Sequence, residues 1–204
     1  MSVSEERDAA PEVRPAAPAS PIADPGPLGL AAFALTTFLL SAANARWMSG
    51  NSAGTAFLGY ALVYGGLAQF LAGMWEFRNR NVFGATAFSS YGAFWMGLYF
   101  WLRDEGTTPL GHDLGWILLA FAIFNTYMLI MSTQVNLAVF VVFLTLELTL
   151  IILVIGNFTS SPGWTQFGGY VGIITAAAAW YTSAAGVANG LGGRIKLPVG
   201  KPLI

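Results

Sequence analysis

The chain has 204 residues, of which 55% are hydrophobic and only 9% are charged, whereas an ordinary water-soluble domain carries about 25% charged residues. This composition, with a mean hydropathy of +0.62, argues against a soluble enzyme. Nine Lys and Arg residues nearly balance ten Asp and Glu residues, so there is no basic surplus to bind the phosphates of a nucleic acid. The sequence contains no cysteine, which excludes disulfides, thiolate metal sites and cysteine nucleophiles.

The first 27 residues differ in composition from the rest of the chain. They contain six of the ten prolines, and a segment so poor in large apolar residues cannot bury enough surface to order itself. Glu5 and Glu6 occupy the place where a cleavable signal peptide has its basic region. We therefore expect residues 1–27 to be a disordered cytoplasmic tail that is not removed.

From Leu28 onward the sequence consists of apolar runs of about 20 residues, the length that crosses roughly 30 Å of hydrocarbon as a helix. There are six such runs, at approximately 28–48, 54–75, 83–102, 115–133, 137–155 and 165–188. Short polar or glycine-containing segments join them. The prediction is an all-α membrane protein with six transmembrane helices in one bundle over residues 28–190, followed by a cytoplasmic C-terminal segment, 191–204.

The orientation follows from the basic residues, which are retained on the cytoplasmic side of the membrane. With both termini inside the cell, seven of the nine cations face the cytoplasm, and only Arg46 and Arg103 lie outside. The seven are Arg7, Arg14, Arg78, Arg80, Arg194, Lys196 and Lys201. This distribution predicts a multi-pass protein of the cell membrane with an N-in, C-in topology.

The last apolar run carries small residues at four-residue spacing, which let helix backbones approach closely. They are Gly168, Gly172, Ala176 and, after an interruption at Trp180, Ala184. The pattern indicates a helix contact, either inside one subunit or between subunits of a homo-oligomer.

Three polar side chains inside the runs stand out. Hydroxyl groups readily form hydrogen bonds with the backbone carbonyls of their own helix, whereas amides and acids do so less easily. They are Gln69, Asn125 and Glu147, and Glu147 is the only acid within these apolar runs. The sole histidine, His112, lies in a predicted loop, so the sequence offers no catalytic constellation, metal site or cofactor motif. A neutral polar lining of this kind suits the passage of a small, weakly polar or monovalent solute.

Several motifs, in chain order, resemble the acetate uptake transporter family. Asp24-Pro25-Gly26-Pro27-Leu28-Gly29-Leu30 is similar to the family signature Asn-Pro-Ala-Pro-Leu-Gly-Leu. Further similar segments are 64–69, 81–95, 155–157 and 197–200. The resemblance, which covers roughly residues 24–200, implies a six-helix protomer with its own pathway in the lipid bilayer, assembled as a homohexamer. It also implies acetate and related short monocarboxylates as substrates, and succinate in some members.

The resemblance also implies which residues line the pathway. The hydrophobic constriction of the family matches Phe33, Tyr91 and Leu146. Polar pathway positions match Thr37, Gln69, Thr86, Ser90 and Asn157. The signature positions carried over are Asp24, Pro25, Pro27, Leu28 and Gly29.

Two departures from the family pattern place carboxyl groups near the expected pathway. Asp24 replaces the asparagine of the signature; its carboxylate can cap the first helix but repels an incoming anion. Glu147 replaces a neutral hydroxyl residue directly after the constriction leucine. One hypothesis is that Glu147 titrates during transport and couples proton to substrate. The alternative is a protonated glutamic acid that is hydrogen-bonded to a neighbouring helix or lies at a subunit interface.

Two other functions stay open at this point. The same hydrophobic constriction would serve another small solute such as ammonia, water or urea. A non-transporting membrane scaffold or sensor would instead use the small-residue stripe of the last helix as its main functional surface. For a transporter, both channel-like conduction and proton symport are compatible with the sequence.

Overall fold

The computed structural model describes residues 22–48, 57–105 and 111–204. Most of the expected tail, and the expected connection around Gly50, lie outside the described residues. Within the described ranges the chain is helical, with no strand.

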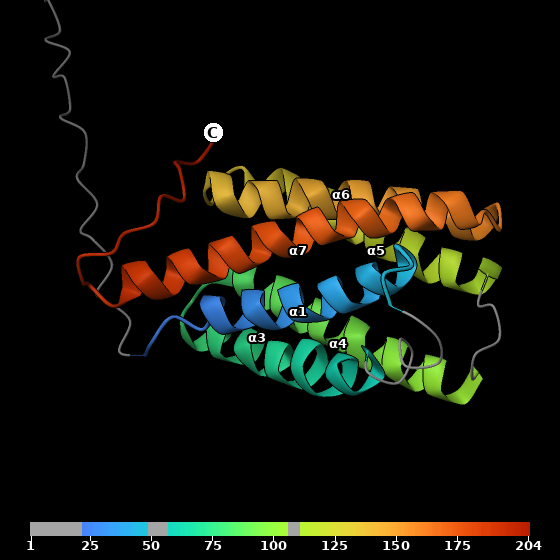
Figure 1. The fold of residues 1–204 in the computed structure, drawn as a ribbon. Helices are drawn as coiled ribbons and strands as arrows, with labels where there is room; N and C mark the ends of the chain where they lie inside the picture. Colours follow the sequence, from blue (N-terminus) through green and yellow to red (C-terminus); the bar gives the residue numbers. More distant parts are fainter. Residues whose placement is uncertain (1–21, 49–56, 106–110) are drawn as a thin grey trace, which may run out of the picture.

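Long helices form one elongated bundle (Figure 1). They are α1 (Gly26–Asn44), a second helical segment (Phe57–Arg78) that contains the π-helix η1 (Ala61–Ala68) and α3 (Gln69–Arg78), α4 (Val82–Glu105), α5 (Gly111–Ser132), α6 (Leu137–Phe158) and α7 (Pro162–Gly190). These bounds lie within about four residues of the predicted runs. All of these segments except α4 are long and apolar enough to cross a membrane.

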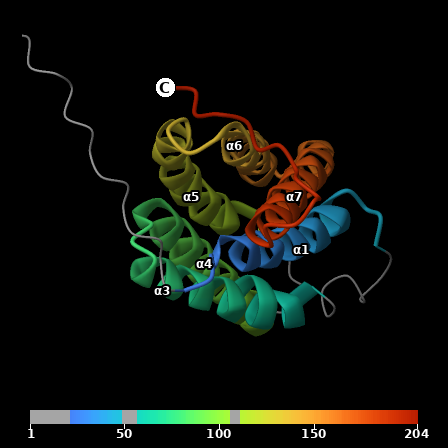
Figure 2. The same cartoon turned by 90° about the vertical axis from the view of Figure 1, so that its left-hand side faces the viewer.

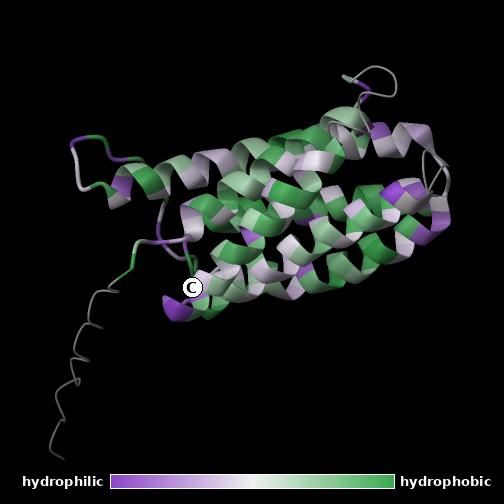
Figure 3. Ribbon diagram, turned by 90° about the horizontal axis from the view of Figure 1, so that it is seen from below, coloured by the Kyte–Doolittle hydropathy of each residue, from purple (hydrophilic) through white to green (hydrophobic). Residues whose placement is uncertain are grey.

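The surface of the bundle matches a membrane environment. Hydrophilic residues gather at the two ends of the helices, whereas the sides are largely apolar (Figure 3). Exposed apolar side chains on these sides include Val63, Leu71, Ile123 and Leu148. Such side surfaces fit the hydrocarbon of a bilayer or the apolar surface of another subunit.

Local sequence fixes where several helices begin. The Asp24 carboxylate accepts a hydrogen bond of 2.9 Å from the backbone N–H of Gly26, the first residue of α1. Asn136 caps α6 by accepting from the backbone N–H of Val139 at 2.9 Å. Prolines occupy the first turns of α1 and α7, where the missing N–H has no helical partner to lose.

Small residues allow α7 to pack closely on its neighbours, as the stripe predicted. Gly168 faces Leu153 of α6, and Gly172 faces both Ser41 of α1 and Thr149 of α6. Ala176 is also fully buried, whereas Ala184 is exposed. Most of the stripe is therefore used for packing inside one chain.

The second helical segment contains a wide π-helical stretch that the sequence analysis did not predict. Its Gly65 lies directly against Thr36 of α1, so that a Cβ atom at this position would overlap the threonine side chain. Glycine therefore permits the close approach of η1 to α1.

Both described ends of the chain lie at the same end of the bundle (Figure 1). After α7 the chain turns back along this end: Tyr181 donates a hydrogen bond of 2.6 Å to the carbonyl of Pro198, and the N–H of Leu203 donates to the carbonyl of Thr133 at 2.7 Å. The C-terminal segment is thus attached to α7 and to the α5–α6 connection.

Candidate transport pathway

Three helices bring the predicted constriction residues together. Phe33 of α1, Tyr91 of α4 and Leu146 of α6 are 4%, 5% and 6% exposed. The rings of Phe33 and Tyr91 meet edge to face, with their centroids 5.7 Å apart. Viewed along the bundle, α1, α4 and α6 surround its interior (Figure 2), so residues far apart in the sequence converge there.

Two small cavities flank these three side chains. One has a volume of about 40 Å³ and the other about 20 Å³, and Phe33, Tyr91 and Leu146 line both. The first extends past Thr37 and Trp95, and the second past Gln69 and Phe88. The three side chains therefore lie where the two cavities meet, as expected for the predicted constriction, and we refer to them as the constriction.

Larger cavities continue this path toward each end of the bundle. Beyond Trp95, a cavity of about 210 Å³ shares Leu40 and Leu118 with the 40 Å³ cavity, and a cavity of about 390 Å³ follows around Arg46 and Asn157. Beyond Gln69, a cavity of about 340 Å³ shares Leu30 with the 20 Å³ cavity. The five cavities form a series with the constriction near its middle.

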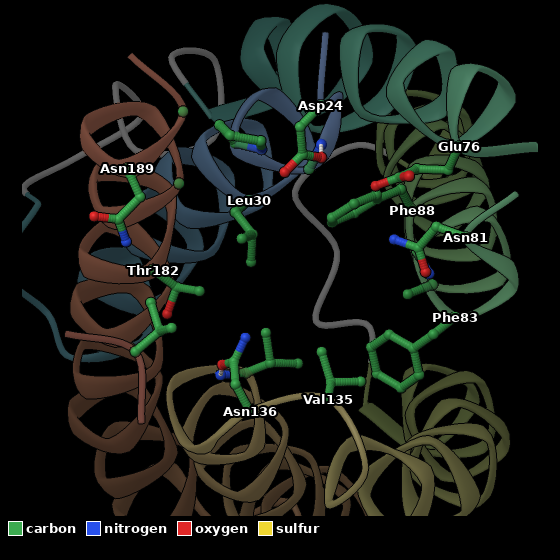
Figure 4. Close-up of a pocket in the computed structure, with 18 of the residues that line it drawn as sticks. Asp24, Leu30, Glu76, Asn81, Phe83, Phe88, Val135, Asn136, Thr182 and Asn189 are labelled. Atoms are coloured by element: carbon green, nitrogen blue, oxygen red, sulfur yellow. Dashed lines mark hydrogen bonds between the residues drawn. The ribbon is translucent and has the colours of Figure 1, made fainter. Parts of the chain in front are cut away.

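The cavity of about 340 Å³, at the end of the bundle where α1 begins, contains two carboxyl groups (Figure 4). The Glu76 side chain is fully buried, and its carboxyl group points toward Asp24. One Glu76 oxygen accepts from the Asn79 side chain at 3.1 Å, whereas Oε1 has no hydrogen-bond partner among the described residues. This mouth of the path therefore carries negative charge when both acids are ionised.

Residues that carry buried, unpaired polar atoms lie on both sides of the constriction. Thr37 and Trp95 line the 40 Å³ cavity, and Gln69 lines the 20 Å³ cavity. The Thr37 hydroxyl, the Gln69 amide and the Trp95 indole N–H find no hydrogen-bond partner among the described groups. Buried polar groups are rarely left unpaired, because each such group costs about 1–3 kcal/mol. These atoms are inaccessible to solvent in this conformation, so a small polar solute would reach them only after side chains around the constriction move.

A chain of hydrogen bonds leads sideways from the constriction. The Tyr91 hydroxyl donates to Asn125 Oδ1 of α5 at 2.7 Å, and Asn125 Nδ2 donates to Glu147 Oε2 of α6 at 2.7 Å. The other Glu147 oxygen accepts from the Thr126 hydroxyl at 2.8 Å. Glu147 lines none of the five cavities. It lies beside the path and is connected to it through Asn125.

The structure brings most of the predicted polar positions to the path. Thr37, Gln69 and Asn157 line its cavities, whereas Thr86 and Ser90 line none of the five. Each of these two residues directly precedes a lining residue on α4, and one helical step turns a side chain by about 100°. Of the signature segment, Asp24, Gly26, Pro27 and Leu30 line the cavity of about 340 Å³.

Sequence reasoning missed Trp95 and Glu76. Trp95 lies four residues after Tyr91, and this helical spacing places the two on one face of α4. Glu76 directly follows the predicted run 54–75, where an acidic residue is expected to be exposed at the membrane boundary. Asn125 stood out in the sequence as a buried amide, but its link to Tyr91 depends on how α4 and α5 meet.

Comparison with known proteins identifies related sequences from bacteria and fungi. The GPR1/FUN34/yaaH family profile matches residues 7–201. The succinate-acetate/proton symporter SatP of Escherichia coli is 34% identical over 88% of this chain and 96% of its own length. Acetate permease A of Emericella nidulans is 38% identical, and the ammonia transport outward protein 2 of Saccharomyces cerevisiae is 40% identical.

The structural comparison agrees with these sequences. The structure of the bacterial acetate channel SatP matches with a TM-score of 0.80 and 34% identity, over 88% of this chain and 99% of the other. The two fungal relatives are longer, and the matched region spans only 64–65% of their length. These relatives are named as transporters and channels, which confirms the resemblance drawn from the sequence motifs. The chain belongs to the GPR1/FUN34/yaaH family.

Proposed function

We propose that this protein is a transporter or channel of the cell membrane that carries acetate and related short monocarboxylates, with succinate as a candidate larger substrate. The names of the bacterial and Emericella relatives support this substrate class. The observation that carries the proposal is the set of unpaired polar groups, Thr37, Gln69 and Trp95, on the two sides of an apolar constriction. A carboxyl group offers hydrogen-bond partners to hydroxyl, amide and indole groups alike.

The proposed membrane arrangement has six spans. In this arrangement α4 also spans the membrane, which brings the number of spans to six. Its 24 residues reach about 36 Å as a helix. An even number of spans agrees with the two described ends of the chain lying at one end of the bundle, which we assign to the cytoplasm. We further propose that the apolar sides of the bundle pack in a homohexamer, with one path in each protomer.

The test is the initial rate of ¹⁴C-acetate uptake into proteoliposomes that contain the purified protein. Tyr91→Ala should change the rate strongly because it opens the constriction. Tyr127→Ala is the matched control, since Tyr127 is 49% exposed on α5 and lines none of the five cavities. Uptake equal to that of protein-free liposomes would contradict the proposal, as would a Tyr91→Ala rate equal to that of the wild type.

Ammonia is a second candidate solute, supported by the name of the Saccharomyces relative. Competition distinguishes the two: unlabelled propionate should reduce acetate uptake, and ammonium at the same concentration and pH should not. The reverse pattern would favour ammonia. A scaffold or sensor would tolerate Tyr91→Ala without any change in the flux of either solute.

We also propose that a proton accompanies the carboxylate. The sequence hypothesis placed this proton on Glu147. Both Glu147 oxygens accept hydrogen bonds from α5 side chains, and the residue lies beside the path. This geometry supports the alternative role, in which Glu147 is bonded to a neighbouring helix and holds Asn125 in place.

A further inference from the structure

The mouth of the path that Asp24 and Glu76 line is wide. Its cavity of about 340 Å³ is far larger than the cavities of about 40 and 20 Å³ beside the constriction. Cavities of about 300 Å³ and more hold drug-sized molecules, so size does not keep a four-carbon dicarboxylate such as succinate out of it. We call this cavity the acidic mouth. Its discrimination between substrates depends on the charges that a substrate meets there.

Two carboxyl groups are held beside the same point of the acidic mouth. The Asp24 carboxylate accepts from the Gly26 N–H at 2.9 Å. A Cβ atom built on Gly26 would lie 3.0 Å from Asp24 Oδ1 and 3.4 Å from Glu76 Oε1, and the Glu76 carboxyl group points toward Asp24 (Figure 4). Asp24 is exposed, and an aspartate in contact with water is ionised at neutral pH. A negative charge therefore stands at this point whether Glu76 is protonated or not.

The opposite wall of the acidic mouth offers a hydrogen-bond donor. Asn136 lines the cavity, and its Oδ1 already accepts from the Val139 N–H at 2.9 Å. Its Nδ2 points into the cavity (Figure 4) and is free to donate there. Apolar side chains, among them Leu30, Phe83 and Phe143, form much of the remaining wall. A monocarboxylic acid can thus place its carboxyl group at Asn136 and its alkyl group on this apolar surface.

A second carboxylate finds no favourable place in the acidic mouth. Among the described residues that line this cavity there is no Arg, Lys or His. The cavity of about 390 Å³ at the other end of the path has the opposite character, since Arg46 lines it and its described lining includes no acid. In the acidic mouth the second carboxylate of a dicarboxylate either faces Asp24 or lies on apolar side chains. Both positions are unfavourable, because one repels the charge and the other removes its water.

We propose that Asp24 is a specificity-determining residue, which makes the acidic mouth select monocarboxylates over dicarboxylates. The family signature has a neutral asparagine at this position, so the discrimination is a property of this chain. A like charge about 6 Å away weakens binding roughly threefold in bulk water, and more strongly at a lower dielectric constant. This inference rests on the proposed function and narrows it, because the mouth disfavours succinate in its doubly charged form.

Competition tests the inference, because a molecule that occupies the mouth slows acetate uptake whether or not it crosses the constriction. Uptake of ¹⁴C-acetate into proteoliposomes is measured with succinate on both sides of the membrane, at constant ionic strength and at pH 7, where both carboxyl groups of succinate are ionised. The half-inhibitory succinate concentration should be at least about threefold lower for Asp24→Asn than for the wild type. Asparagine keeps an oxygen that accepts from the Gly26 N–H, which protects the local fold. The half-inhibitory concentration of propionate, a monocarboxylate, should change by less than about twofold.

Three outcomes would count against these assignments. The same half-inhibitory succinate concentration for Asp24→Asn and the wild type would overturn the inference. An equal fall for succinate and propionate would also overturn it, because the substitution would then have opened the mouth without changing its selectivity. Absence of protein-dependent acetate uptake in the wild type would instead overturn the proposed function itself.

Two variants serve as controls. Asp24→Glu keeps the negative charge and should keep the weak inhibition by succinate; inhibition as strong as in Asp24→Asn would contradict a role of the charge. Asp113→Asn removes the same charge from an exposed residue of α5 that lines none of the five cavities. It should match the wild type with both competitors. Succinate inhibition as strong as in Asp24→Asn would assign the effect to the net charge of the protein and not to the mouth.

Discussion

Because the Trp95 indole N–H is unpaired, replacing Trp95 should affect the stability of the protein and its transport activity differently. Burying an N–H group without a partner costs about 1–3 kcal/mol, and Trp95→Phe removes that group. The smaller ring leaves a void, because the indole packs against Phe57 and Phe94 with centroid distances of 5.8 and 5.0 Å. The void should lower the free energy of unfolding by about 1–2 kcal/mol, as the deletion of a few buried carbon atoms does. The two effects oppose each other, so the unfolding temperature of the variant should stay close to that of the wild type.

Transport should respond much more strongly. Under the proposed function the Trp95 N–H donates to the passing carboxyl group, and the Phe variant lacks this donor. An unpaired group of this kind costs about 1–3 kcal/mol, or roughly 5- to 150-fold in affinity. The half-saturating acetate concentration for uptake into proteoliposomes should rise by such a factor.

The control is Trp116→Phe, the same chemical change at a residue of α5 that is 58% exposed; it should alter neither quantity. An unchanged half-saturating concentration in Trp95→Phe would refute the assigned contact between the indole and the substrate. A large drop in unfolding temperature would refute the premise that the N–H is unpaired in the empty protein.

Three further substitutions test other parts of the structure. Glu147→Gln retains an oxygen that accepts from Asn125, so uptake and its pH dependence should match the wild type; a flattened pH profile would instead identify Glu147 as the titrating proton carrier. Asp24→Asn keeps the oxygen that accepts from Gly26 but removes a negative charge at the mouth, and a neutral acid predicts less than about a twofold change in half-saturating acetate; a several-fold gain in affinity would indicate that the anion passes. Gly65→Ala places a Cβ atom against Thr36 and should lower the free energy of unfolding by about 1–3 kcal/mol in detergent, whereas Gly97→Ala, with open space around it, should be neutral or slightly stabilising; equal unfolding temperatures for the two would contradict the close approach of η1 to α1.

The helices were predictable because their signal is local. A run of about 20 apolar residues suffices for a span, and the predicted run 137–155 corresponds to α6, Leu137–Phe158. The π-helical stretch Ala61–Ala68 was not predictable in this way, since its apolar composition is that of an ordinary span. Its widened turn accompanies the contact of Gly65 with Thr36, which forms only when η1 and α1 are packed together.

The candidate site was predictable only in part, for a related reason. The family resemblance supplied Phe33, Tyr91 and Leu146, and the structure brings them together. The hydrogen bonds of Asn125 depend on residues 34 and 22 positions away in the chain. No pattern within one helix reveals such partners, so Glu147 looked like an isolated acid until the packing of α5 on α6 placed Asn125 and Thr126 beside it.

The scarcity of charge along the path bears on the form of the substrate. A carboxylate that leaves water for a narrow apolar constriction loses solvation worth several kcal/mol unless cations or several donors replace it. In the two cavities that meet at the constriction, the lining residues include no Arg or Lys, and the unpaired groups are Thr37, Trp95 and the Gln69 amide. A protonated acid carries no net charge and so loses far less solvation free energy on entering the constriction. The carboxyl groups of Asp24 and Glu76 at the mouth are then no obstacle, because a neutral molecule is not repelled by them. The same low charge that identifies the chain as a membrane protein thus favours a permeant molecule that carries its own proton.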